Sequence, residues 1–196
     1  MTADELAEVK ARMLREDPEY RAKVEAVEAA RRQQVQALRS AEQPIIRDLR
    51  AVGCDVNSVW DLVNTTEPYE DALPVLLGHL ECGGYPDRVM ESLGRAMAVK
   101  PAVAFWDQLK TLYLRAENPG EEEGLALALA AAATGAQLKE LTDLVQDESR
   151  GPTRIHFVRA LLNIGGAEGR STVETLRHHP TVGKEARALL RTRRVR

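Results

Sequence analysis

Aromatic residues are scarce in this chain, at 4% of 196 residues, although hydrophobic residues as a whole make up 44%. The apolar share is carried by Ala, Leu and Val rather than by Ile, Phe, Tyr or Trp. Aromatic and β-branched residues favour strands, whereas Ala and Leu are strong helix formers. The composition therefore predicts helices rather than sheets.

Cysteines are few, and neither sign of charge dominates. Cys54 and Cys82 lie in unrelated segments, without metal-ligand spacing or a disulfide-dense pattern, which is typical of a reducing compartment. The formal net charge of -3 and the isoelectric point near 5.9 give no general attraction for a phosphate backbone. These features do not favour nucleic-acid binding, although they leave room for a local basic patch.

Long apolar runs are also missing. The N-terminus, MTADELAEVKARMLRED, is charged throughout and lacks the apolar core of a signal peptide. The longest apolar run, Leu125 to Thr134, is about half the length needed to cross a bilayer. We therefore expect a cytoplasmic protein with no membrane-spanning segment.

Two helices are predicted in the N-terminal part of the chain. Thr2 and Glu5 form a capping-box pattern, which predicts a short amphipathic helix that ends near Asp17. Pro18 then begins a second helix, which is expected to end at about Ser40. Its apolar stripe is thin, so the helix over 18–40 is either exposed or pairs with itself or a partner.

The Gln43-Pro44 pair interrupts this pattern and sets the expected domain boundary. The predicted organisation is an N-terminal helical extension over 1–42 and a repeat domain over 43–196. Beyond Pro44 no run alternates at period two. Helices are expected near 44–52, 57–65, 70–82, 86–99, 102–116, 121–134, 136–147, 152–164, 168–178 and 181–193.

The repeat domain shows internal similarity at a helical-hairpin period. The sequence QLKTL at 108–112 recurs as QLKEL at 137–141, and PDRV at 86–89 recurs as PTRI at 152–155. The mean period is roughly 32 residues, which lies within the range of helical repeats. Because one hairpin cannot bury its own apolar face, successive hairpins are expected to stack. The expected pairs cover about 86–120, 121–151 and 152–180, followed by a closing helix from about 181.

Two segments resemble HEAT repeats. RGPTRIHFVRALLNIGGAEGRSTVETLRHHPTVGKEARALL resembles one repeat followed by the start of the next, with Pro-x-Arg-Ile opening the first helix and Leu-x-x-Ile-Gly closing it. DALPVLLGHLECGGYPDRVMESLGRAMAV is similar to a second helix and the first helix that follows. The resemblance covers about 45–192 and fades before Asp71. It implies an all-α fold, a short right-handed α-solenoid of HEAT-like hairpins, and it specifies no activity.

No segment carries a strong catalytic or metal-binding motif. Glu121, Glu122 and Glu123 read as the start of a helix, and no Ser, Thr or Cys has the context of a nucleophile. The histidines lack metal-ligand spacing on a helix face; they are His79, His156, His178 and His179. We therefore expect a non-catalytic protein without a metal or cofactor.

Nucleic-acid binding is the alternative function. HEAT-like DNA alkylation-repair glycosylases resemble this chain in architecture, and they line a basic concave groove with aromatic and acidic residues. The residues that could imitate this groove are Trp60, Trp106, Asp107 and Tyr113. The middle repeats lack a dense Lys/Arg stripe, which argues against it. A basic tail could contact phosphates through Arg191, Arg193, Arg194 and Arg196.

Protein binding is the leading hypothesis, with the second helix of each pair on the concave face. The repeat register places Leu109, Leu138 and Val173 inside and leaves their neighbours outside. Aromatic and Arg residues are common anchors of binding surfaces. The candidate partner-binding residues are Trp106, Lys110, Tyr113, Lys139, Arg170 and Arg177. For Trp106 and Tyr113 the other interpretation is packing between repeats.

Overall fold

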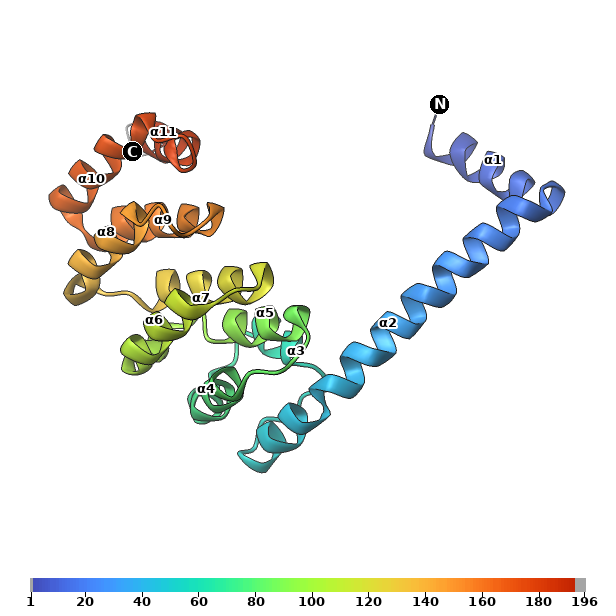
Figure 1. Cartoon of the computed structure of the whole chain (residues 1–196), viewed down its shortest axis with the longest axis horizontal. Coiled ribbons are helices and arrows are strands. Elements are labelled where there is room, and N and C mark those ends of the chain that lie inside the picture. The colour runs from blue at the N-terminus through green and yellow to red at the C-terminus, as the bar shows by residue number, and fades with distance from the viewer. Residues whose placement is uncertain (1, 193–196) are drawn as a thin grey trace. The chain divides into compact units, whose positions relative to one another are not determined.

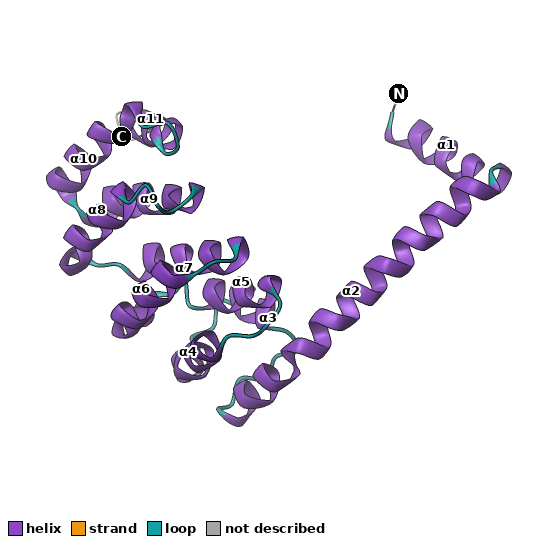
Figure 2. Cartoon of the chain, viewed as in Figure 1, coloured by secondary structure: helices purple, strands orange, loops and turns teal. Residues whose placement is uncertain are grey.

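The chain is all-α over residues 2–192, the part that the computed structural model describes, and this part contains no strand (Figure 2). The composition-based expectation of an all-helical fold is confirmed. The chain divides into two compact units, Met1–Ala41 and Glu42–Arg196. Helix α2 (Pro18–Ala51) contributes residues to both.

The first unit contains α1 (Ala3–Glu16) and the first part of α2. The predicted capping box is present, because Thr2 Oγ1 accepts from the Glu5 N–H and Glu5 Oε2 accepts from the Thr2 N–H. Arg21 closes the other end of α1 by donating to the carbonyls of Leu14 and Arg15, at 2.7 Å each. Apolar side chains remain exposed in this unit, and Val27 is 63% exposed.

Helix α2 continues through Pro44 and ends at Ala51, so the predicted end near Ser40 and the break at Gln43-Pro44 are wrong. A proline inside a helix removes one backbone hydrogen bond and crowds the preceding turn. The residues that follow it compensate, because Ile45, Ile46 and Leu49 are buried in the core of the second unit. Burial of this turn outweighs the local preference to stop.

The second unit contains nine further α-helices within the described residues, at positions close to the predicted ones. Short 3-10 turns precede or follow several of them, including η2 (Lys100–Phe105) and η5 (Leu176–His178). The helices are α3 (Val59–Asn64), α4 (Leu73–Cys82), α5 (Asp87–Ala96), α6 (Trp106–Arg115), α7 (Pro119–Ala132), α8 (Leu138–Gln146), α9 (Ile155–Ile164), α10 (Gly166–Thr175) and α11 (Gly183–Thr192).

Helices α4 to α11 form two layers in the second unit (Figure 1), and α3 packs on α5. The inner layer contains α5, α7, α9 and α11, and neighbours in this order pack against each other. The outer layer contains α4, α6, α8 and α10, each of which also packs on an inner-layer helix. The core lies between the layers, where Leu93, Leu125, Leu129 and Phe157 are fully buried.

Helices α5 and α7 approach each other closely at two glycines. A Cβ added to Gly94 would lie 2.5 Å from the carbonyl carbon of Gly124, and one added to Gly124 would lie 2.6 Å from the Glu91 carbonyl oxygen. Real Cβ atoms do not approach backbone this closely. Glycine at both positions therefore allows the two helix backbones to touch.

Polar contacts join the last turns of α2 to α3 and α4. The buried Glu42 carboxylate accepts hydrogen bonds from Ser58 and from the Val59 N–H, and burial raises its pKa. Asp48 Oδ2 lies 3.3 Å from His79 Nε2, and His79 Nδ1 lies 2.7 Å from the Tyr85 hydroxyl. The end of α2 is thus held by specific polar partners as well as by its buried isoleucines.

The segment between α8 and α9 holds the ends of two outer-layer helices. Arg150 Nη1 donates to the carbonyls of Tyr113 and Ala116, at 3.1 and 3.2 Å, at the end of α6. Arg154 is buried, and its Nη1 donates to the Val145 carbonyl at 3.0 Å, at the end of α8. Arg150 thus adds a second donor to the Tyr113 carbonyl, which also accepts from the Ala116 N–H, and both arginines donate to carbonyls at helix ends, where intrahelical partners run out.

Candidate partner-binding site

The six predicted partner-binding residues all lie on the outer-layer side, on α6, α8, α10 and η5. The sequence-based expectation put these second helices on the concave face. Figure 1 instead shows α5, α7, α9 and α11 on the inner side of the bend in the second unit. The expected orientation is therefore wrong, and the six residues do not form one surface.

Trp106 and Lys110 converge on Glu140 of α8. The indole Nε1 donates to Glu140 Oε2 at 3.1 Å, and Lys110 Nζ donates to the same oxygen. Trp106 is only 5% exposed, so packing, the other interpretation of this residue, is correct. The hydrogen bond from Lys110, with a second from Trp106, lowers the pKa of Glu140. The cluster ties α6 to α8 and offers little indole surface to a partner.

This lowered pKa makes the cluster sensitive to acid. A carboxyl group with a lower pKa in the folded state contributes stability above its unfolded pKa, and this contribution is lost as pH falls through the folded pKa. We expect Glu140→Gln to lower the melting temperature at neutral pH and to leave it nearly unchanged in acid. Thermal melts from about pH 2 to pH 7 measure the difference. Glu81→Gln, on the exposed side of α4, is the control, and an equal effect of both variants at all pH values would contradict the prediction.

Tyr113 lies in the core. It is fully buried, and its ring meets Phe157 edge to face, with centroids 5.4 Å apart and planes at 82°. Its hydroxyl is 3.2 Å from Thr153 Oγ1, and burial raises the pKa of Tyr113 to about 12. The prediction that Tyr113 contacts a partner is therefore wrong for this structure.

The residues considered for a glycosylase-like groove do not line one surface together. Trp60 lies on α3, where Arg88 is 4.6 Å from the ring centroid and Arg95 is 5.8 Å away. Trp106 and Tyr113 are buried, and Asp107 is exposed on α6. The two buried aromatic rings cannot stack on an extruded base.

Three of the remaining candidates have clear positions. Arg170 and Arg177 meet at a cavity of about 210 Å³ between α10, η5 and α11, whereas Lys139 is exposed on α8. Of the predicted basic tail, Arg191 lines this same cavity. Arg193, Arg194 and Arg196 lie outside the described residues.

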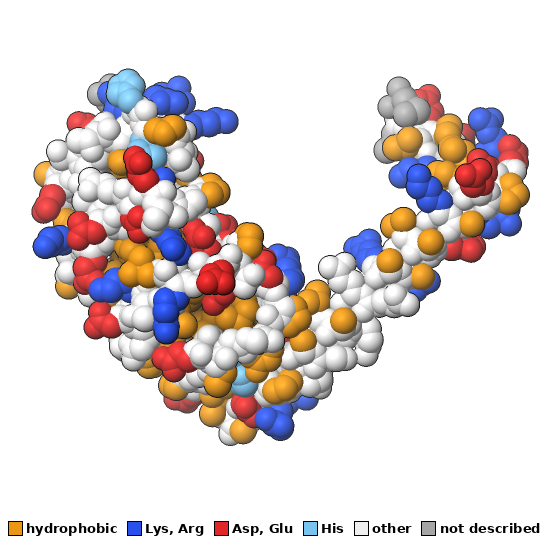
Figure 3. All heavy atoms as spheres, viewed as in Figure 1, with side chains coloured by type: hydrophobic (Ala, Val, Ile, Leu, Met, Phe, Trp, Pro, Cys, Tyr) orange, Lys and Arg blue, Asp and Glu red, His pale blue; other side chains and the backbone are white. Residues whose placement is uncertain are grey.

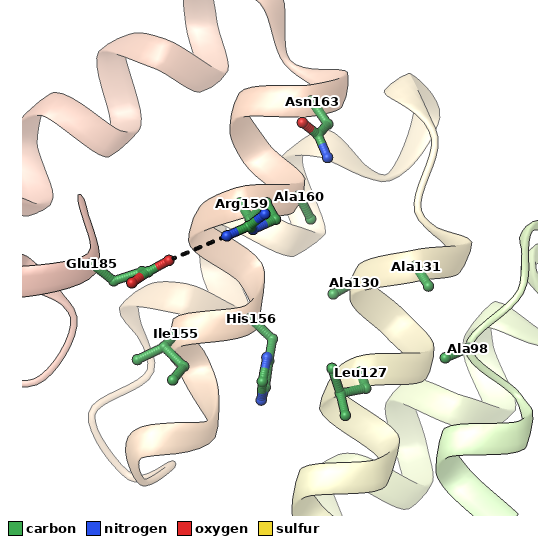
Figure 4. Close-up of a pocket in the computed structure, with 10 residues that line it drawn as sticks. All are labelled: Ala98, Leu127, Ala130, Ala131, Ile155, His156, Arg159, Ala160, Asn163 and Glu185. Carbon is green, nitrogen blue, oxygen red and sulfur yellow. Dashed lines mark ion pairs between the residues drawn. The ribbon is translucent and has the colours of Figure 1, made fainter. Parts of the chain in front are cut away.

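A groove with a volume of about 460 Å³ lies between the inner-layer helices α7, α9 and α11. Figure 4 shows Leu127 and two alanines of α7 on one side and the side chains of α9 on the other. Ile155 is 36% exposed at its edge, although it is a large apolar residue. The lining residues are Ala98, Leu127, Ala130, Ala131, Ile155, His156, Arg159, Ala160, Asn163 and Glu185.

Charged groups at the groove are paired with one another across the inner layer. Arg159 Nη2 lies 3.9 Å from Glu185 Oε1, which joins α9 to α11 (Figure 4). His156 Nε2 lies 2.9 Å from Glu123 Oε1, and Arg95 Nη2 is 3.5 Å from the same oxygen. These pairs hold the charged side chains at the rim and leave the alanine floor open.

Sequence reasoning missed this groove, although a signal was present. The run from Leu125 to Thr134 lies within a predicted helix and is too short to cross a membrane. Within it, Leu127, Ala130 and Ala131 have the i, i+3, i+4 spacing of one helix face. Small side chains on an exposed helix face leave a depression beside larger neighbours, and this pattern could have pointed to α7.

Residues 2–192 contain no group of three or more His, Cys, Asp and Glu side chains arranged to hold a metal ion. Within the same residues, no helix combines the length and the apolarity needed to cross a membrane. Comparison with known proteins found no matching family model, no matching curated protein and no matching solved structure.

Proposed function

We propose that this chain is a non-catalytic, cytoplasmic protein-interaction module that binds a partner protein through the inner layer of a short HEAT-like α-solenoid. The groove between α7, α9 and α11 carries the proposal, because it combines an apolar floor with paired charges at its rim. Binding surfaces of proteins commonly have this anatomy of an apolar centre and a polar rim.

The layered packing supports the solenoid part of the proposal. Each inner-layer helix packs on the next one, and each outer-layer helix packs on an inner-layer helix. Repeat proteins of this kind present long continuous faces, and they bind partners there rather than in deep clefts. An inner-layer surface that crosses several helices suits a partner segment that lies across the helices.

The chemistry of the groove defines the partner segment. Ala130 and Ala131 leave room for aliphatic side chains, and Ile155 offers an exposed apolar contact at the edge. Arg159 and Glu185 at the rim can exchange their mutual ion pair for charges on the partner. We infer a helical or extended segment with a few aliphatic residues flanked by charges of both signs.

Cross-linking from the groove in living cells tests this proposal. A photo-reactive amino acid at Ile155 is expected to capture a partner protein, whereas the same residue at Leu114 on α6 is expected to capture none. Ile155 and Leu114 are matched, because both are large apolar residues with exposures of 36% and 41%. Nuclease treatment before analysis identifies products that depend on nucleic acid.

Blocking the groove floor should remove the cross-link from Ile155. Ala131→Arg fills the groove, and loss of a buried contact patch of this kind costs about 2 kcal/mol or more of binding, enough for at least a tenfold weaker complex. Ala136→Arg adds the same side chain on the exposed turn η3 (Gly135–Gln137) and is the control. Two results would contradict the groove as the binding site. One is equal capture of the partner from Leu114, and the other is capture from Ile155 that Ala131→Arg leaves unchanged although the variant is folded.

A further inference from the structure

The cavity between α10, η5 and α11 gathers arginine side chains from three elements. Arg170 and Glu174 come from α10, Arg177 comes from η5, and Arg187 and Arg191 come from α11. Leu190, which is buried, completes the lining. Positions 170, 174 and 177 follow one another at spacings of four and three along α10 and η5, and on α11 positions 190 and 191 lie three and four residues after 187, so each set shares one helix face. The two faces meet because α10 and η5 pack against α11.

The local charge of this cavity is opposite to that of the whole chain. Four arginines and one glutamate give it a formal surplus of three positive charges, whereas the chain has a net charge of -3. Figure 3 shows Lys and Arg side chains gathered over α11 near the C-terminal end. A concentrated positive charge in an acidic chain attracts an anion at this one place.

Contacts within the cavity hold two of its arginines. Arg170 Nε lies 3.3 Å from Glu174 Oε1, and this pair engages the Nε edge of the guanidinium group. Arg187 Nη1 donates to the Arg177 carbonyl, which holds the Arg187 side chain against η5. An arginine that is already held loses less side-chain entropy when it binds a ligand.

The arrangement favours one compact anion with more than one negative charge. Planar guanidinium groups match phosphate oxygens with paired hydrogen bonds, and a phosphomonoester carries about -1.5 to -2 charges at neutral pH. Among the described residues no aromatic side chain lines the cavity, whereas proteins that bind single-stranded nucleic acid stack bases on aromatic rings. The arginines also surround one cavity rather than follow a track along which successive phosphates could lie.

We propose that the cavity of Arg170, Arg177, Arg187 and Arg191 binds a phosphomonoester, carried by a phosphorylated serine or threonine of a protein partner. This inference extends the proposed function by a second contact, at a site separate from the α7–α9–α11 groove. Phosphorylation of the partner would then control how tightly it is held.

Titrations with defined phosphate probes test this inference without the natural partner. The arginine Nε–Hε signals of the whole chain are followed by NMR, in about 0.15 M salt to screen non-specific attraction. The probes are inorganic phosphate, a short neutral peptide with one phosphoserine, the same peptide with Ser or Glu at that position, and an oligothymidylate. The phosphopeptide is expected to bind at least about tenfold more tightly than the Ser and Glu peptides.

A double variant identifies the cavity as the site. Arg177→Gln with Arg187→Gln is expected to weaken phosphopeptide binding at least about tenfold. Arg32→Gln with Arg115→Gln removes the same total charge from exposed positions outside the cavity, and it is expected to leave binding unchanged. If both double variants lost the same affinity for the phosphopeptide, the loss would be due to the overall charge of the chain, and the inference would be overturned.

Two other results would also overturn it. Tighter binding of oligothymidylate than of the phosphopeptide would assign the cavity to nucleic acid, and equal binding of the Glu and phosphoserine peptides would assign it to carboxylates. If neither inorganic phosphate nor the phosphopeptide shifted the Nε–Hε signals of the cavity arginines, the cavity would not be a phosphate-binding site. None of these results affects the cross-linking test from Ile155, so failure of the cavity and failure of the groove are distinguishable.

Discussion

Gly94→Ala is expected to lower the free energy of unfolding by about 1–3 kcal/mol, which is the usual cost of overpacking a rigid interior. The added methyl group would lie 2.5 Å from the Gly124 carbonyl carbon and 2.8 Å from the Gly124 Cα. These atoms belong to the backbone of α7 and cannot rotate away. Relief therefore requires α5 and α7 to separate, which disturbs the core around Leu93 and Leu125.

Gly78→Ala is the matched control for this variant. Gly78 lies inside α4, and a Cβ at this position would meet no atom within 4 Å. Alanine is a better helix former than glycine by about 0.5–1 kcal/mol, so this change is expected to raise stability slightly. Urea unfolding followed by circular dichroism measures both variants. If the Gly94→Ala and Gly78→Ala variants had the same free energy of unfolding, that result would contradict the close contact between the backbones of α5 and α7.

Tyr113→Ala is expected to cost about 3–5 kcal/mol of stability, as is typical for removal of a large buried aromatic residue. It removes the edge-to-face contact with Phe157 and leaves Thr153 without its phenol partner. Tyr113→Phe keeps the ring and loses only the hydroxyl, so a smaller loss of about 1 kcal/mol is expected. Denaturant unfolding at neutral pH should rank the wild type first, Tyr113→Phe second and Tyr113→Ala last. If Tyr113→Ala left the free energy of unfolding unchanged, Tyr113 could not be buried in the core.

The same residue gives the protein a weakness in alkali. Burial raises the pKa of Tyr113 from 10.0 to about 12, so the folded state keeps the phenol proton where the unfolded state has lost it. The stability that this group contributes is full below the unfolded pKa and is lost as pH rises through the folded pKa. Stability should therefore fall between about pH 10 and pH 12, and it should fall less steeply in Tyr113→Phe.

Local signals predicted the helices well. Thr2 and Glu5 lie three residues apart, and their capping box needs nothing beyond this short segment. The glutamates at 121–123 likewise predicted a helix start from neighbouring residues alone, and α7 begins two residues earlier, at Pro119. Helix boundaries that depend on such short-range chemistry can be read from sequence because their partners lie within one turn.

The errors arise where distant residues decide the outcome. Pro44 locally favours the end of a helix, but the burial of Ile45 and Leu49 outweighs this preference, and that burial cannot be recognised from neighbouring residues. Trp106 has its partner Glu140 on another outer-layer helix, and no local pattern shows that the two side chains meet. Which helices lie on the inner side of the bend depends on how all the helices pack. For this reason the sequence predicted the binding residues on the outer-layer helices and did not predict the groove on the inner layer.

The loop that contains Arg150 and Arg154 has a consequence for cooperativity. It caps the end of α6 through one side chain and the end of α8 through another, although these helices are separated in sequence by α7. Opening the loop removes the arginine donors from the Tyr113, Ala116 and Val145 carbonyls at once. We therefore expect the final turns of α6 and α8 to open together when this loop opens.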